Sequence, residues 1–168
     1  RIGQALAEAY RNGMSGMRSH VDWIQEEAPL AWSVLGEMAQ DWRGKVDIQR
    51  SSLTPLNMLG DVEFGAAIAS RVYRDREVMG CFVYRNENVD ALLEQVFLYA
   101  SRYELMLDFH VDEGLEPEAA AFDRIVELTR YFRMSGRVLC GHACSLSIRP
   151  EGEVSHIISE AAESGIAL

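Results

Sequence analysis

The chain has 168 residues, of which 48% are hydrophobic and 25% are charged. This composition is typical of a globular protein and excludes a disordered chain. The net charge of −10 argues against a nucleic-acid partner, because no segment gathers enough Lys and Arg to offset repulsion from phosphates.

The cysteines and the apolar runs indicate where the protein resides. Cys81, Cys140 and Cys144 all lie in or beside apolar runs, and their odd number does not predict a disulfide framework. No apolar run approaches the roughly 18 residues that span a bilayer, and no basic-then-apolar leader opens the chain. We therefore expect a cytoplasmic protein that does not contact membranes.

Hydrophobic spacing predicts helices and strands that alternate along the chain. The first helix carries Ile2, Leu6 and Tyr10 on one face and ends at Asn12 and Gly13. The predicted strands cover residues 14–22, 45–49, 78–84, 105–110 and 137–147. The predicted helices between and after them start at or just after Leu30, Asp61, Asn88, Pro117 and Val154.

This order gives five strand-helix units after the first helix, followed by the first residues of a sixth strand. Strict alternation predicts an α/β fold with a parallel sheet and helices outside it. A closed eight-stranded barrel and an open doubly wound sheet both fit this pattern. We expect residues 1–168 to form one domain. As a TIM-type (β/α)8 barrel it would be partial, with five to six strands present and strands missing at both ends.

Two strand ends carry groups suited to catalysis. Residues 105–113 begin as an apolar run and finish with His110, Asp112 and Glu113. Such a run is typical of a buried parallel strand whose carboxyl end is functional. Residues 137–145 repeat the pattern and deliver His142. Because strands joined by one helix are usually parallel neighbours, both histidines are expected to lie at the same end of the sheet. We call this end, where the strands reach their carboxyl ends, the mouth.

These residue types suit metal-assisted proton transfer. Histidine can hold a metal ion, and a carboxylate can accept a proton from a water that the metal activates. His110 and Glu113 can both reach the mouth if the strand turns into a loop after His110. For each histidine the alternative is a structural hydrogen bond. Asp112 is expected to orient the loop rather than bind metal, and Gly141 to allow close backbone approach beside His142.

Three further residues have two interpretations each. His20 could line the same mouth or act as a structural partner of Asp22. Gln49 ends the next predicted strand, where its amide could donate to and accept from the edge of a heterocycle. Cys144 could be a nucleophile or a thiolate ligand, but a small buried cysteine is the commoner case and is preferred.

Four stretches together resemble the cytosine deaminase branch of the amidohydrolase superfamily. They are Ser19-His20-Val21-Asp22, Val46-Asp47-Ile48-Gln49, Asp108-Phe109-His110-Val111-Asp112-Glu113 and Cys140-Gly141-His142-Ala143-Cys144-Ser145-Leu146. The resemblance implies a metal-dependent barrel hydrolase. In such an enzyme water, activated by one divalent ion of zinc or iron, displaces ammonia from cytosine or a related pyrimidine or triazine.

The resemblance also implies roles for individual residues. His110, from the fifth barrel strand, would be a metal ligand, and Glu113 would carry the proton from water to the ring nitrogen and the leaving group. His142, from the sixth strand, would bind or polarise the attacking water. Gln49 would bind the amide edge of the substrate, and we place His20 with it as a substrate-binding residue. Members of this branch are typically cytoplasmic oligomers, so a homo-oligomer is expected.

The sequence also departs from the family pattern. The family takes further ligands from a His-x-His pair on its first strand and an aspartate on its eighth, and neither stretch occurs in this chain. Two histidines cannot supply the three protein ligands of a usual catalytic site. We therefore expect an excerpt of a longer enzyme. The alternative is a non-catalytic half-barrel that acts as an oligomerisation or interaction module. A nucleotide-binding sheet is disfavoured, because no glycine-rich loop follows the first strand.

Overall fold

The computed structural model describes residues 1–116 and 118–168. Within them one parallel sheet has the strand order β1-β2-β3-β4-β5, which is the order of the chain. The strands are β1 (Gly16–Asp22), β2 (Asp47–Pro55), β3 (Val78–Val83), β4 (Met106–Val111) and β5 (Val138–His142). The predicted parallel α/β sheet is confirmed.

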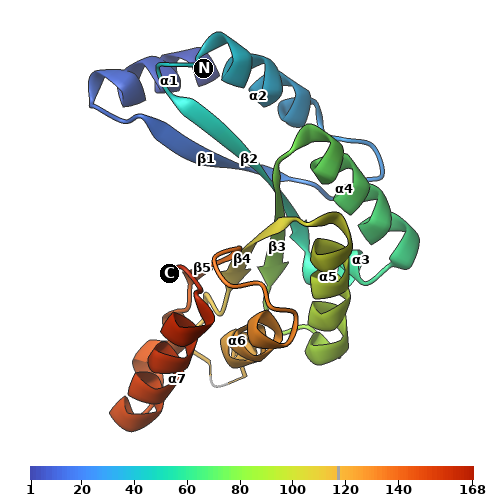
Figure 1. Ribbon diagram of the computed structural model, residues 1–168, viewed down its shortest axis with the longest axis vertical. Helices are drawn as coiled ribbons and strands as arrows, with labels where there is room; N and C mark the ends of the chain where they lie inside the picture. The colour runs from blue at the N-terminus through green and yellow to red at the C-terminus, as the bar shows by residue number, and fades with distance from the viewer. Residues whose placement is uncertain (117) are drawn as a thin grey trace.

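Helices follow the strands and lie in an arc around one face of the sheet, as Figure 1 shows. They are α1 (Ile2–Arg11), α2 (Leu30–Asp41), α3 (Leu56–Leu59), α4 (Val62–Asp75), α5 (Val89–Tyr103), α6 (Ala121–Tyr131) and α7 (Glu151–Ser164), with a 3-10 helix η1 (Cys144–Ile148). The described residues thus form a half-barrel, with helices outside and a concave inner face. Beside β5, a single parallel bridge between Leu139 and Ala167 begins the next strand, as predicted.

Alternation along the strands separates the core from the inner face. In β4, Leu107, Phe109 and Val111 are buried towards the helices, and the Phe109 ring stacks on Phe97 of α5 with centroids 5.8 Å apart. His110 lies between these residues in sequence and therefore points to the inner face. The apolar half of β4 anchors the strand, so its polar half is held in a fixed register.

The helix starts match the sequence prediction unevenly. Asp61 caps α4, since its carboxylate accepts hydrogen bonds from the backbone N–H groups of Glu63 and Phe64 at 3.0 and 2.9 Å. Asn88 precedes α5, but its side chain makes no capping hydrogen bond with the described residues. Pro117, predicted to start a helix, lies outside the described residues, and α6 begins at Ala121.

Two predicted strand ends are wrong. β2 continues to Pro55, because its polar residues Ser51, Ser52 and Thr54 are small and fully buried within the sheet rather than part of a loop. Gln49 therefore lies in the first half of β2 and not at its end. β5 stops at His142 instead of continuing to Ser147, and η1 follows it.

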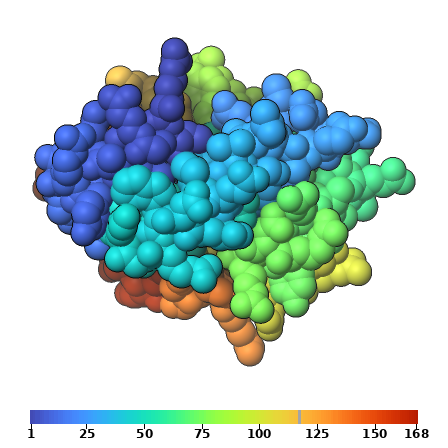
Figure 2. Space-filling view, turned by 90° about the horizontal axis from the view of Figure 1, so that it is seen from above, coloured from blue at the N-terminus to red at the C-terminus, as the bar shows by residue number. Residues whose placement is uncertain are grey.

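The outside of the half-barrel is closely packed. Figure 2, seen from above, shows the dark-blue N-terminal residues beside the lighter-blue and cyan residues, which in turn adjoin the green ones. Every helix in the part of the chain that the structure describes is too short or too polar to cross a membrane.

Candidate active site

The carboxyl end of β4 directs two neighbouring acids in different directions. Asp112 has a left-handed backbone with φ of 52°, and its buried carboxylate accepts hydrogen bonds from the N–H groups of Ala121 and Phe122 at 3.0 and 3.1 Å. Asp112 therefore caps α6 and orients the loop, as predicted. The turn leaves the next residue, Glu113, free to reach the mouth beside His110.

The end of β5 is bent sharply at the second histidine. His142 and Ala143 have φ values of 75° and 47°, in the left-handed region that residues other than glycine rarely adopt. The bend is held by hydrogen bonds from Ala143 N to Val111 O at 3.0 Å and from Ser145 N to Asp112 O at 3.3 Å. Such strain costs about 1–3 kcal/mol per residue and is commonly found at functional sites.

Two expectations for the small residues around His142 are wrong: Gly141 is not needed for close backbone approach, and Cys144 is not fully buried. A Cβ atom on Gly141 would meet the Phe109 carbonyl oxygen at 3.6 Å, which is ordinary contact, so close approach does not require glycine there. Cys144 is only partly buried and belongs to neither group of potential metal ligands among the described residues. The unusual backbone conformation is instead that of His142 itself, with its positive φ.

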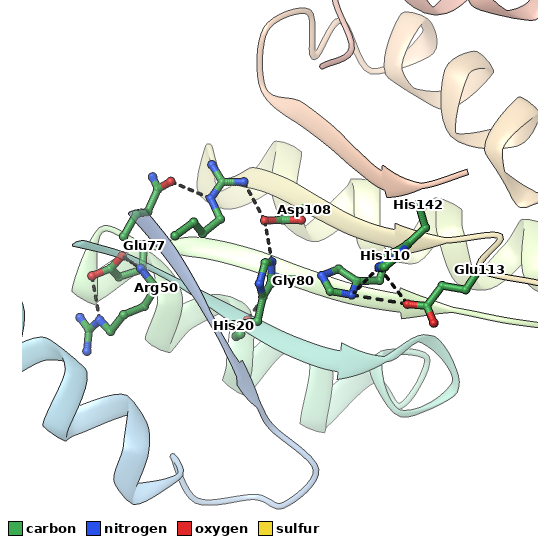
Figure 3. A network of polar contacts seen from close by, with 11 residues as sticks. His20, Arg50, Glu77, Gly80, Asp108, His110, Glu113 and His142 are labelled. Carbon is green, nitrogen blue, oxygen red and sulfur yellow. Dashed lines mark hydrogen bonds and ion pairs between the residues drawn. The ribbon is translucent and has the colours of Figure 1, made fainter. Parts of the chain in front are cut away.

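The two predicted histidines and the predicted carboxylate meet at the mouth, as Figure 3 shows. Glu113 Oε1 lies 3.0 Å from His142 Nε2 and 3.7 Å from His110 Nδ1. The two facing ring nitrogens of His142 and His110 are 3.3 Å apart. All three side chains are part-exposed, with relative exposures of 21% for His110 and 40% for the other two, so water can reach them.

The surroundings of His110 favour its neutral imidazole. Burial lowers the pKa of His110, and the neighbouring His20 and His142 lower it further, while Asp108 and Glu113 act in the opposite direction. A neutral ring nitrogen is the form that binds metal ions. His110 can therefore serve as a ligand at neutral pH.

The donor set at the mouth fits part of a metal site. One donor atom each from His110, Glu113 and His142 lies within 4.8 Å of the others. Two nitrogen ligands on a tetrahedral zinc ion, each about 2.1 Å from it, would be about 3.4 Å apart. The observed 3.3 Å between the His110 and His142 nitrogens allows both to reach one ion, or His142 to reach a water on an ion held by His110.

A cavity of about 310 Å³ opens beside these groups. It is lined by His110 and Glu113 together with Asp22, Leu53 and Phe82. A larger cavity of about 510 Å³ lies between the loop after β1 and the start of α4, where Met58, Asp61 and Phe64 line it. Because its walls include no histidine, we assign the site to the smaller cavity, where the donor groups converge.

His20 belongs to the same inner face, but its partner differs from the one considered from sequence. Its Nε2 lies 3.1 Å from Asp108 Oδ2, so Asp108, and not Asp22, is its hydrogen-bond partner. Its ring meets the His110 ring edge to face, with centroids 4.5 Å apart. His20 is thus a neighbour of the mouth residues.

Gln49 lies on β2 well before the end of the strand that reaches the mouth. In the β1–β2 register, Gln49 pairs with Arg18 while Leu53, four residues further along β2, pairs with Asp22. Four residues of strand correspond to about 13 Å. The Gln49 amide oxygen accepts a hydrogen bond from Arg18 Nε at 2.8 Å. The prediction that Gln49 stands at a strand end is therefore wrong.

Sequence reasoning missed Arg18 and the acid before His110 as parts of the site. Asp108 is only 1% exposed and lies two residues before His110 on the same strand face. A charged residue inside an otherwise apolar strand requires a partner, which here is Arg18 at 2.7 Å. The charged Asp108 inside an apolar strand could therefore have indicated from sequence that a buried ion pair exists there.

No protein-family model matches the chain. The chain is 28% identical over all 168 of its residues to a pterin deaminase of Rhizobium rhizogenes and covers 38% of that protein. It therefore spans about two fifths of the length of this curated relative.

Two solved structures share the fold. The 5-methylcytosine deaminase of Klebsiella pneumoniae, liganded with phosphonocytosine, matches with a TM-score of 0.80 and 21% identity, over 97% of this chain and 40% of that one. The N-isopropylammelide isopropylaminohydrolase of Burkholderia multivorans matches with a TM-score of 0.84 and 26% identity, over 97% and 43%. The five-stranded half-barrel thus has the fold of part of a TIM-type barrel, and the chain is similar over nearly its whole length to deaminases and hydrolases of the amidohydrolase superfamily.

Proposed function

We propose that the protein carrying this chain is a metal-dependent hydrolase that removes an amino group from a nitrogen heterocycle. The observation that carries the proposal is the convergence of Glu113 Oε1 on His142 Nε2 at 3.0 Å and on His110 Nδ1 at 3.7 Å. A carboxylate between two imidazoles at the mouth of a half-barrel can accept a proton from water and return it to a leaving group.

Each of the three groups has one task in this reaction. His110 would hold a divalent ion by Nδ1, the nitrogen that faces the other two groups. When bound, zinc or iron would act as a Lewis acid that lowers the pKa of water. Glu113 would take one proton from the attacking water and pass it to the ring nitrogen. It would then take the second proton from the hydroxyl added to the ring and pass it to the amine, which leaves as ammonia while the carbonyl forms. His142 orients the water through Nε2.

The substrate proposed is an aminopyrimidine ring, either alone, as in cytosine, or fused, as in pterin, with an aminotriazine as a further case. In these rings the carbon that bears the amine adjoins a ring nitrogen, which Glu113 can protonate. The cavity supports a flat ring, since Leu53 and Phe82 give it apolar lining beside His110 and Glu113.

Other parts of the assignment stay predictions. The substrate-binding role of His20 and Gln49 is untested, and their contacts favour a different role that is developed below. A cytoplasmic homo-oligomer with water as co-substrate is likewise our expectation for this enzyme.

The test uses the protein expressed at its full native length and loaded with zinc or with iron. Incubation with cytosine, 5-methylcytosine and pterin should release one ammonia per ring converted for at least one substrate. His110→Ala should abolish ammonia release and lower the metal content. Folded, oligomeric protein that neither binds metal nor releases ammonia would instead support the non-catalytic interaction module.

A further inference from the structure

The inner face of the sheet carries a polar network that the proposed reaction does not use. Arg18 and His20 are two apart on β1, and Asp108 and His110 are two apart on β4, so each pair shares one strand face. Figure 3 shows His20 and Asp108 in contact beside His110, on the side away from Glu113.

The network is centred on one buried carboxylate. Asp108 Oδ2 accepts hydrogen bonds from Arg18 Nη1 at 2.7 Å and from His20 Nε2 at 3.1 Å. A carboxylate paired with a guanidinium only accepts hydrogen bonds, so His20 must present Nε2–H to it. Asp108 thereby sets both the tautomer and the orientation of the His20 ring.

The fixed ring of His20 in turn packs against His110. The rings of His20 and His110 are 4.5 Å apart and inclined at 70°. On its other side, the His110 ring meets that of His142 at 4.9 Å and 64°. His110 is therefore held between two imidazoles. Of these, His142 contacts Glu113 at the mouth, while His20 is hydrogen-bonded to Asp108 on β4.

The far end of the network is also anchored. Arg18 Nε donates to the Gln49 amide oxygen at 2.8 Å, which aligns the guanidinium with Asp108. Donor atoms of His20, Asp108 and His110 lie within 4.8 Å of one another and could in principle hold an ion. Arg18 already neutralises Asp108 at 2.7 Å, and its positive charge opposes a cation there. The arrangement suits positioning rather than metal binding.

We propose that Arg18, Asp108 and His20 are positioning residues that fix the His110 imidazole, with Gln49 as the anchor of Arg18. Their effect on turnover rests on the proposed function. Their effect on the orientation of His110 does not, so that orientation is measured separately. The substrate-binding alternative for His20 makes a different prediction, because loss of a substrate contact raises KM, whereas loss of positioning lowers kcat.

The test compares Asp108→Ala with Asp108→Asn, which keeps one acceptor oxygen, in protein of full native length. The control is Asp47→Ala, an exposed carboxylate that lines, together with Gln49 and Asp108, a further cavity of about 510 Å³. In metal-free protein, the side-chain nitrogen resonances of His110 should shift and broaden in Asp108→Ala, less so in Asp108→Asn, and remain unchanged in the control. The Kd for zinc should rise about 10–100-fold in Asp108→Ala. Where a substrate has been found, kcat should fall with KM kept within about twofold.

Several outcomes would overturn the proposal. One is a set of His110 resonances that stays unchanged in Asp108→Ala. Another is a rise in the zinc Kd as large as that of His110→Ala, which would make Asp108 a metal ligand. If Asp108→Ala does not fold, Arg18→Met takes its place and must shift the His110 resonances in the same way. A protein that releases no ammonia, yet shows the resonance changes, would refute the proposed function and leave this inference standing.

Discussion

Asp112 and Glu113 are adjacent in sequence, yet their carboxylates serve different parts of the molecule. The Asp112 carboxylate is buried and binds the first N–H groups of α6 at 3.0 and 3.1 Å, while Glu113 Oε1 lies 3.0 Å from His142 Nε2. The left-handed turn at Asp112 produces this divergence. The acid that caps the helix therefore also determines where the proposed proton carrier stands.

Replacing Asp112 with alanine should cost both stability and activity. Loss of a helix cap costs about 0.5–2 kcal/mol of the free energy of unfolding. The released loop should also let Glu113 move away from His142, so kcat should fall. Chemical denaturation and steady-state kinetics measure the two effects. The control, Asp90→Ala, removes a carboxylate that is 75% exposed and should stay within about 0.5 kcal/mol of the parent. An Asp112→Ala protein with unchanged stability would show that the cap is not needed.

Replacing Glu113 with glutamine should remove the proton carrier at nearly constant volume. We expect kcat/KM for ammonia release to fall about 10²–10⁴-fold, the usual range for loss of a general acid-base group. The side chain is 40% exposed, so the free energy of unfolding should stay within about 0.5 kcal/mol. Glu116→Gln, a nearby carboxylate at 39% exposure, is the matched control and should keep its activity. Full activity of Glu113→Gln would assign proton transfer to another group.

Acid should weaken the outer face of the sheet through Asp75. Burial acts to raise the pKa of Asp75, but hydrogen bonds from Trp32 Nε1 at 2.6 Å and Arg71 Nε at 2.8 Å outweigh it, so the pKa is lowered. A carboxyl with a lower pKa in the folded state than in the unfolded state stabilises the fold at pH values above the unfolded pKa, about 3.9. This stabilisation is lost as the pH falls through the folded pKa.

Urea unfolding between pH 7 and pH 2.5 measures this contribution in the parent and in Asp75→Asn. The stability gap between the two proteins should be constant above about pH 5 and should shrink as the pH falls below about 4. Asp41→Asn removes an exposed carboxylate at the end of α2. Its free energy of unfolding should fall with decreasing pH in the same way as that of the parent. A gap that is independent of pH would mean that Asp75 contributes through packing alone.

The strand-helix order could be predicted from sequence, because each element carries its own apolar period. Leu107, Phe109 and Val111 alternate with polar residues, and this alternation is enough to place His110 on the opposite face of β4. The meeting of His110, Glu113 and His142 followed from a general rule, that neighbouring parallel strands end at the same edge of a sheet.

The end of β2 and the network beneath the site could not be predicted in this way. Ser51 and Ser52 read as loop residues, and only the packing of neighbouring strands on both sides shows that they are fully buried. Asp108 meets Arg18 across a sequence separation of 90 residues, which no local pattern reveals. Tertiary context decided both features.

The three cysteines should differ sharply in reactivity. Cys81 and Cys140 are 0% and 1% exposed, and burial raises the pKa of both thiols far above the usual range, so neither forms a thiolate in the native protein. Cys144 is only partly buried, in the 3-10 helix that follows His142. Brief treatment of native protein with iodoacetamide at pH 8, followed by peptide mass mapping, should modify Cys144 alone. The other two should react only after unfolding in urea, and a Cys144→Ser variant should show no modification at these three positions. Native labelling of Cys140 would mean that β5 opens readily, and the fixed placement of His142 beside Glu113 would then be lost.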